Sequence, residues 1–532
     1  MIRFLILDSI SSRISQQSTK KNEIQLGLPS NFKGIFSELS RPNTIAIVGV
    51  ALGDEGKGRI VDNKIEELLR DKKIKQVSVI RFQGGNNAGH TVEKDGVKLA
   101  LHLVPSFVFH EKAQGIMDRG MVVHVEDLQT EVGYVEDAVG SLKNRLLLSD
   151  DAILCTDLER AEEFLNGLSQ EGSKGGTGRG IGPSYAHHYD KTGLRISDLL
   201  QNDWENNLTK RYEQYEKIFA AFSLHLSDID VPDFSKTVKE KKAIKRQLGS
   251  KREFLTRLHS SRAWLSKRNI VTNTYKFHLQ IAVDQSMAIV FEGAQAAGLD
   301  VWTGTRPDVT SSNTTAYGIR EGTGFWRLQD VSERIGIIKL PYTSSVGARR
   351  MPTHIDIPND PSFWQVPKGR VQNQKEDRSW ISQDDELNKN QQWGQWVREE
   401  AYEYGTTTGR PRDINFLDLP FIAYNARMSG VEMLMGTHLD ICREKDEIKI
   451  CTHYTDKKGK IVPYQPGLQY LTDVVPNYIS VPGWDGMACR KAKMPGDLPI
   501  HALKFLSFMQ LRLGYPFIAT TTGPTRNNFL SF

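Results

Sequence analysis

The 532-residue chain has few cysteines and no long apolar run. Its four cysteines show neither CxxC nor zinc-ligand spacing, which excludes a disulfide framework and a structural zinc site and predicts reduced thiols. No apolar run approaches the ~18 residues of a membrane span, and the amino terminus carries no cleavable signal pattern. These absences predict a soluble protein of the cytoplasm with no membrane partner.

The net positive charge is small, and it comes from one segment. The net charge is +5, yet residues 235–268 carry twelve Lys or Arg against two Glu, so the rest of the chain sums to about −5. Such a run can bind nucleic acid, but no aromatic stacking motif interleaves with the charges. Phe254, Leu258 and Leu265 recur at helical spacing, so we expect a helical segment with its cations in water and no nucleic-acid partner.

The chain lacks a Walker A motif but has another glycine-rich loop. The apolar run 44–50 has the composition of a buried strand and breaks into a loop followed by apolar residues at helical spacing. A strand, a glycine turn and a helix N-terminus together favour phosphate, although an ordinary tight turn is the alternative. Gly58 stands where Walker A requires Ser or Thr. Asp54, inside the loop, could instead hold a metal or take a proton.

A second predicted strand, 77–82, runs into a loop that ends in a histidine. Residues 83–91 read Gln-Gly-Gly-Asn-Asn-Ala-Gly-His-Thr, and their glycines allow a ligand to approach the backbone. A lone histidine is usually structural. Because His90 follows a phosphate loop, it becomes a candidate acid.

Together the two loops resemble the adenylosuccinate synthetase family. Residues 53–58 and 83–91 carry the resemblance, and further segments extend it from about Ile45 to Pro524. It implies one large α/β unit, P-loop-NTPase-like, with a large central, mostly parallel β-sheet flanked by helices and with subdomains grown from loops.

The same resemblance divides the chain into two parts. Residues 1–43 form an N-terminal extension, and residues 44–532 form the catalytic domain. That domain contains the basic segment 235–268 and a polar insertion, 359–400. The insertion holds four tryptophans, which predicts a small packed appendage rather than disorder.

The activity that the resemblance implies is a GTP-dependent ligase reaction of purine biosynthesis. IMP and L-aspartate give adenylosuccinate, GDP and phosphate through 6-phosphoryl-IMP, with one Mg²⁺ per active site. Asp54 and His90 are then catalytic: Asp54 takes the N1 proton of IMP, and His90 stabilises charge on the phosphate. Asp54 and the Gly89 carbonyl are the metal ligands. A homodimer is implied, in which Lys191 reaches the IMP phosphate of the neighbouring site.

Substrate contacts carry over from the resemblance position by position. For GTP they are Gly53, Asp54, Glu55, Gly56, Lys57, Gly58, Arg59, Gly89, His90, Thr91, His438, Leu439, Asp440, Thr521, Thr522 and Gly523. For IMP they are Asp54, Lys57, Asn87, His90, Thr177, Lys191, Gln295, Thr310, Val346 and Arg410. For L-aspartate they are Thr406, Thr407, Thr408, Gly409, Arg410 and Arg412.

Side-chain chemistry agrees with several of these contacts. The Gln295 amide can read a purine edge at the end of a strand. Arg410 and Arg412 lie one residue apart on a glycine-containing loop and can clamp a dicarboxylic amino acid, although a basic turn is the alternative. Asp440 can accept from both N1–H and the 2-amino group of guanine, which distinguishes guanine from adenine.

Three positions depart from the family. Lys191 and Ser345 stand where the family has arginine, and His438 replaces a lysine whose stem covers the base. Two rivals follow: a sister ligase acting on a 2-aminopurine nucleotide such as dGMP with ATP or GTP, and a nucleotide-binding protein without turnover. The retained Asp54 and Asp440 count against the first rival, and the intact Asp54 and His90 count against the second.

Overall fold

The structure is a computed structural model that describes residues 43–168, 177–240, 244–345, 351–357, 388–404 and 411–532. The described residues belong to one compact unit. The N-terminal extension up to residue 42 and the part of the insertion before residue 388 lie outside the described residues. Within the described residues, no helix has the length and apolar character needed to cross a membrane.

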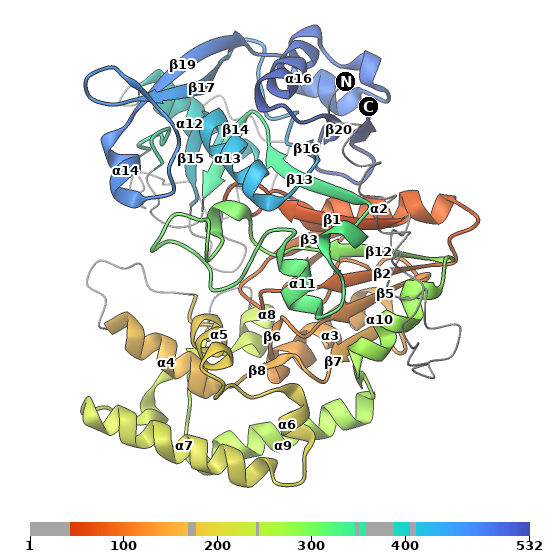
Figure 1. The fold of residues 1–532 in the computed structure, drawn as a ribbon, viewed down its shortest axis with the longest axis vertical. Helices are drawn as coiled ribbons and strands as arrows, with labels where there is room; N and C mark the ends of the chain where they lie inside the picture. The colour runs from red at the N-terminus through yellow and green to blue at the C-terminus, as the bar shows by residue number, and fades with distance from the viewer. Residues whose placement is uncertain (1–42, 169–176, 241–243, 346–350, 358–387, 405–410) are drawn as a thin grey trace, which may run out of the picture. The chain divides into compact units, whose positions relative to one another are not determined.

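A ten-stranded sheet forms the centre of the described unit, in the order β11-β7-β5-β2-β12-β1-β13-β16-β20-β21 (Figure 1). Every neighbouring pair is parallel except β20 and β21. The predicted α/β class with a mostly parallel sheet is therefore confirmed. The strands are β1 (Thr44–Gly49), β2 (Gln76–Arg81), β5 (Ala113–Met117), β7 (Leu146–Ser149), β11 (Val271–Thr272), β12 (Met287–Glu292), β13 (Glu333–Lys339), β16 (Met433–Thr437), β20 (Phe517–Thr521) and β21 (Phe529–Ser531).

Helices cover this sheet, which explains its nearly continuous apolar strands. All residues of β1 and β12 are buried, as expected where a parallel sheet has both faces covered. Helix α2 packs against β1, β2 and β12. The α-helices are α2 (Lys57–Arg70), α3 (Val125–Val139), α4 (Asp157–Leu168), α5 (Ile181–Tyr189), α6 (Ile196–Leu200), α7 (Trp204–Ala221), α8 (Phe234–Glu240), α9 (Lys251–Arg268), α10 (Thr274–Val283), α11 (Gly318–Thr323), α12 (Lys389–Glu400), α13 (Leu419–Ser429), α14 (Leu468–Asp473), α15 (Gly486–Lys491) and α16 (Ile500–Leu513).

Smaller sheets grow from the connections. A five-stranded sheet contains β14 (Tyr342–Ser345), β15 (Asp413–Asp418), β17 (Glu447–Thr455), β18 (Ile461–Val462) and β19 (Val475–Pro482). Two-stranded pairs join β3 (His90–Lys94) to β4 (Val97–Leu101), β6 (Val122–His124) to β8 (Ile153–Cys155), and β9 (Asp230–Pro232) to β10 (Lys245–Gln247).

Helix α12 is the described end of the tryptophan-containing insertion, and it packs as expected. Trp393 and Trp396 are buried. Trp393 stacks on Phe416 of β15 at a centroid distance of 5.4 Å, and the Arg443 guanidinium lies 4.3 Å from the Trp396 ring. This helix is therefore part of the second sheet's packing.

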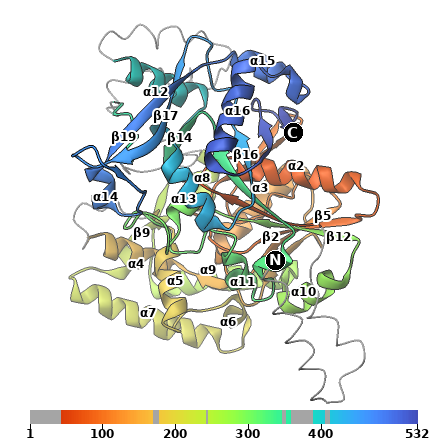
Figure 2. The same ribbon diagram turned by 45° about the horizontal axis from the view of Figure 1, so that its top comes forward.

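The basic segment forms helices on the sheet's β7 side, where α4, α5, α6, α7 and α9 gather in both views (Figures 1 and 2). Phe254, Leu258 and Leu265 of α9 are buried, as predicted. The expectation that its cations stand in water was wrong for several of them. Arg246 and Arg257 pair with Asp157 at 2.9 and 3.3 Å, so part of the local positive charge neutralises acidic side chains inside the protein.

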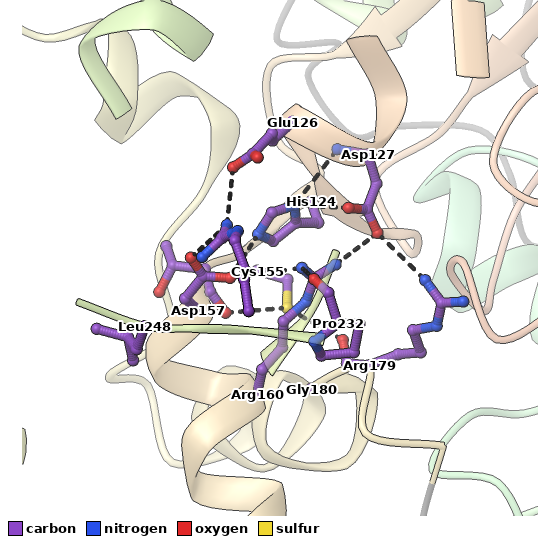
Figure 3. Close-up of polar contacts among 12 residues, drawn as sticks. His124, Glu126, Asp127, Cys155, Asp157, Arg160, Arg179, Gly180, Pro232 and Leu248 are labelled. Atoms are coloured by element: carbon purple, nitrogen blue, oxygen red, sulfur yellow. Dashed lines mark hydrogen bonds and ion pairs between the residues drawn. The ribbon is translucent and has the colours of Figure 1, made fainter. Parts of the chain in front are cut away.

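These ion pairs belong to a buried cluster between α3, α4 and α9 (Figure 3). His124 lies between Asp127 and Asp157, at 3.3 and 3.4 Å, and Arg160 lies 2.5 Å from Asp127. Burial would raise the pKa of Asp127, but Arg160 and His124 overcome it and hold this pKa well below its usual value. The cluster therefore keeps charged carboxylates inside the helical region.

Arg160→Met should lower the free energy of unfolding by about 3–5 kcal/mol, because it leaves Asp127 buried without its nearest cation. Arg252→Met, on the exposed face of α9, should change it by less than about 0.5 kcal/mol. Urea unfolding at pH 7 measures both. Folding lowers the pKa of Asp127, so the difference in unfolding free energy between wild type and Arg160→Met should shrink as the pH falls below about 4. A difference that does not change with pH would contradict its ionic origin.

Candidate active site

The strand register brings the predicted loops to one edge of the sheet. Ile47 of β1 lies opposite Glu292 of β12, which in turn lies opposite Arg81 of β2. These strands end at the same level, so the segments that follow them leave the sheet together. Ligands of open α/β sheets bind at the carboxyl ends of the strands, and this edge is the candidate active site.

The first glycine loop, residues 50–56, folds around the carboxylate of Glu55. Glu55 is buried and accepts hydrogen bonds from the amides of Ala51 (3.2 Å) and Gly53 (2.8 Å). Its other oxygen lies 2.8 Å from the Lys57 ammonium. The Glu55 side chain is thus engaged within the protein, so a nucleotide contact at this position would involve the backbone. Its role is to shape the loop and to hold Lys57 at the helix start.

Helix α2 begins beside this loop with uncapped amides. Its N-cap is Gly56, at φ +86°, and no side chain caps the first turn; such amides bind anions. A Cβ on Gly58 would come within 3.0 Å of the His90 Cβ, so glycine permits the close approach. Arg59 donates to the Gly523 carbonyl. The helix start therefore contacts both the second loop and the carboxyl-terminal segment.

His90 is held by Glu292, a residue that the sequence analysis did not identify as part of the site. His90 Nδ1 lies 2.6 Å from Glu292 Oε1, and both side chains are buried. Glu292 also accepts from the amide and hydroxyl of Ser106, at 2.9 and 2.5 Å. Burial lowers the pKa of His90, although Glu292 opposes this. The ring is therefore neutral, with Nδ1–H donated to Glu292 and Nε2 left for a ligand.

Gln295 presents an unpaired amide at the same edge. Both polar atoms of its side chain are buried and have no hydrogen-bond partner within the described residues. Leaving such a group unpaired costs roughly 1–3 kcal/mol, which a base with complementary donors and acceptors would recover. Asn87 Nδ2 lies 3.4 Å from Thr310 Oγ1, so these two predicted IMP contacts meet.

Asp54 forms an ion pair with the predicted aspartate-binding arginine. Asp54 has φ +56°, and its side chain, 29% exposed, lies 2.6 Å from Arg412 Nη2. Arg412 Nη1 lies 2.8 Å from the buried Glu403. The remaining predicted aspartate contacts, Thr406, Thr407, Thr408, Gly409 and Arg410, lie outside the described residues, as does Val346.

The predicted guanine element lies where β16 and β20 end side by side. The amides of His438 and Leu439 donate to the hydroxyl and the carbonyl of Thr521, at 3.1 and 3.2 Å. Asp440 is buried and pairs with Arg490 Nε at 2.7 Å. Burial raises the pKa of Asp440, and Arg490 opposes this rise. The carboxylate is thus held by a cation that the sequence analysis did not identify.

Two predicted IMP contacts, Thr177 and Lys191, flank helix α5. Thr177 and Lys191 are exposed, and Lys191 has φ +69° just after α5. The amides of Gly178 and Gly180 are occupied by the Glu163 carboxylate, at 2.9 and 2.6 Å. Gly178 and Gly180 therefore do not offer their amides to a phosphate.

The metal ligands predicted from the sequence are oxygen atoms of the first two loops. Mg²⁺ is usually bound by one or two carboxylates together with waters and substrate phosphates. Within the part of the chain that the structure describes, no group of three or more His, Cys, Asp or Glu could form an all-protein metal cage. The partly exposed Asp54 carboxylate and the Gly89 carbonyl fit a site that phosphates complete.

The chain matches the family model described as adenylosuccinate synthetase over residues 46–530. The chain belongs to the adenylosuccinate synthetase family. Members of this family are ligases of purine biosynthesis (EC 6.3.4.4) that join IMP and L-aspartate with GTP and Mg²⁺. The expected family, reaction class and co-substrate are thus confirmed.

Curated relatives and solved structures resemble the chain over most of its length. The adenylosuccinate synthetase of Aquifex aeolicus is 32% identical over 494 residues, covering 91% of this chain and 96% of that protein. The enzyme of Streptococcus gordonii is 30% identical, with 91% and 97% covered. A fully ligated adenylosuccinate synthetase structure from Plasmodium falciparum aligns with a TM-score of 0.73 at 26% identity, covering 92% of this chain and 100% of that one.

Glu292→Gln should lower the pKa of His90 further, because the carboxylate is the neighbour that favours imidazolium, and should reduce turnover by roughly 10²-fold. A histidine NMR titration and a phosphate-release assay measure the two effects. Ser106→Ala keeps the Glu292 charge and serves as the matched control. An equal loss of turnover in the two variants would mean that the charge of Glu292 has no special role.

Proposed function

We propose that this chain catalyses the ligation of IMP and L-aspartate with GTP, with residues 44–532 as the catalytic domain and Asp54 and His90 as catalytic residues. The observation that carries the proposal is the meeting of three features at adjacent strand ends: Asp54 with Arg412, His90 with Glu292, and the unpaired Gln295 amide. Together they offer a base, an imidazole and a purine-reading group.

In the first step, Asp54 accepts the N1 proton of IMP, and O6 attacks the γ-phosphorus of GTP, which breaks the bond to the β,γ-bridging oxygen and releases GDP. The uncapped amides of α2 and the Lys57 ammonium neutralise phosphate charge. His90 Nε2 faces the phosphates, whose negative charge raises the pKa of the ring and allows it to donate a hydrogen bond. Asp54 and the Gly89 carbonyl would hold Mg²⁺, whose charge would offset negative charge on the transferred phosphoryl group.

In the second step, the amine of L-aspartate displaces phosphate at C6. Arg412 would bind a carboxylate of the amino acid through its planar fork. Because Arg412 also pairs with Asp54 at 2.6 Å, binding of the amino acid would draw this cation toward the substrate. Asp440 would bind the guanine of GTP, and Gln295 would bind the hypoxanthine of IMP.

Asp54→Asn should keep the fold and lower turnover by roughly 10²–10⁴-fold, because the amide cannot take the N1 proton. Asp95→Asn is a matched control: Asp95 also has a positive φ, +51°, and is exposed. A phosphate-release assay with IMP, L-aspartate and GTP measures both. Near-normal turnover of Asp54→Asn would exclude it as the base.

The proposal includes a homodimer and a cytoplasmic location. The exposed Lys191 and its neighbour Tyr189, 65% exposed, would lie in the interface and bring Lys191 to the IMP phosphate of the partner site. Four free, buried cysteines suit a reducing compartment.

Lys191→Ala should weaken the binding of IMP and leave the binding of GTP nearly unchanged. Lys191→Arg should preserve IMP binding, because guanidinium keeps the charge and adds a bidentate contact. Mixing Lys191→Ala with Asp54→Asn should restore part of the activity, since one site of a mixed dimer holds both native residues. Sedimentation measures the oligomeric state, and the phosphate-release assay measures the recovered activity. A monomer, or no recovery after verified subunit exchange, would refute the shared site.

A further inference from the structure

The buried carboxylate of Glu403 joins two regions of the candidate site. Glu403 is 1% exposed and follows α12 by three residues. Its Oε1 lies 2.6 Å from the Lys339 ammonium and 2.5 Å from the Tyr342 hydroxyl. Its Oε2 accepts from Arg412 at 2.8 Å and from Ser344 at 3.0 Å. Four donors thus saturate one carboxylate.

The charge state of Glu403 follows from these partners. Burial alone would raise its pKa, but Lys339 and Arg412 overcome burial and hold the pKa of Glu403 well below its usual value. An ionised carboxylate has no hydrogen to donate. Every hydrogen bond at Glu403 therefore points toward it.

That constraint fixes the direction of a hydrogen-bonded chain to His438. The Tyr342 hydroxyl also lies 2.7 Å from His438 Nδ1. Since its single hydrogen is donated to Glu403, the oxygen of Tyr342 can only accept from the ring. His438 Nδ1 must then carry the hydrogen. In a neutral imidazole, Nε2 is left with a lone pair.

The surroundings support the neutral form, because burial, together with the nearby Lys339, lowers the pKa of His438 to about 3. His438 also has φ +65°, and its amide is bonded to Thr521. Backbone and ring are thus both restrained beside Asp440. The guanine subsite of this chain presents an uncharged ring of defined tautomer.

We propose that Glu403 is a positioning residue for two co-substrate subsites at once: it anchors Arg412 at the aspartate subsite and, through Tyr342, fixes the tautomer of His438 at the guanine subsite. This inference rests on the proposed function for the identity of the two ligands. The network has two arms: one joins Glu403 to Arg412, and the other joins Glu403 through Tyr342 to His438. Substitutions should separate the effects of these two arms.

Tyr342→Phe removes only the arm to His438. It should raise the KM for GTP by roughly 3- to 10-fold, the equivalent of one hydrogen bond, and leave the KM for L-aspartate and kcat within about twofold. Glu403→Gln removes the charge from both arms and should raise both KM values. Ser344→Ala deletes a hydrogen bond to the same carboxylate but touches neither arm, so it should change neither KM.

A spectroscopic measurement tests the tautomer without turnover. In ¹⁵N-histidine-labelled full-length protein, the His438 signals, identified by their loss in His438→Asn, should show a protonated Nδ1 and an unprotonated Nε2 at neutral pH. In Tyr342→Phe, the tautomer preference should weaken. A protonated Nε2 in the wild type would overturn the proposal.

The outcomes separate this inference from the proposed function. If the wild type does not turn over IMP, L-aspartate and GTP, the proposed function fails, and calorimetric titration of wild type and Tyr342→Phe with GTP and with L-aspartate then decides the inference. Equal effects of Tyr342→Phe on both ligands, or an effect of Glu403→Gln on only one, would overturn it. Because Tyr342→Phe loses a single hydroxyl, the test does not depend on Glu403→Gln folding.

Discussion

The candidate site depends on the parallel pairing of β12 with β1 on one side and β2 on the other. This register places Glu292 opposite Ile47 and Arg81. The loops that follow the three strands therefore begin at the same edge of the sheet. If β12 moved by one residue, its side chains would exchange faces, and Glu292 would no longer meet His90 across 202 positions of sequence. The chemistry at this edge is thus set by backbone hydrogen bonds of the core.

A second property of the site is that its charged side chains pair with one another. Lys57 pairs with Glu55, Asp54 with Arg412, and Asp440 with Arg490. Such pairing offsets the cost of burying charge and keeps the groups oriented. Substrates would then exchange one set of partners for another instead of organising free side chains, as expected of a preorganised electrostatic site.

The sequence predicted the strands and the loops well, because their signals are local. The run 44–50 became β1, the run 77–82 became β2, and the helix after the first loop became α2. The partners Glu292, Glu403 and Arg490 were missed, because no local spacing connects them to His90, Arg412 or Asp440. The cations of α9 were misjudged for the same reason: whether an arginine meets water or Asp157 is decided by which helix packs beside it.

The end of the insertion shows how far such long-range pairing reaches. Glu400, the last residue of α12, lies 2.9 Å from Arg490, which itself pairs with Asp440. Glu403, three residues later, bonds Arg412 and Tyr342. One short segment thus holds a residue that contacts the partner of Asp440, the proposed guanine contact, and another that contacts Arg412, the proposed aspartate contact. Because two buried tryptophans anchor α12, the packing of this helix also helps to position Glu400 and Glu403 and, through them, Arg490 and Arg412.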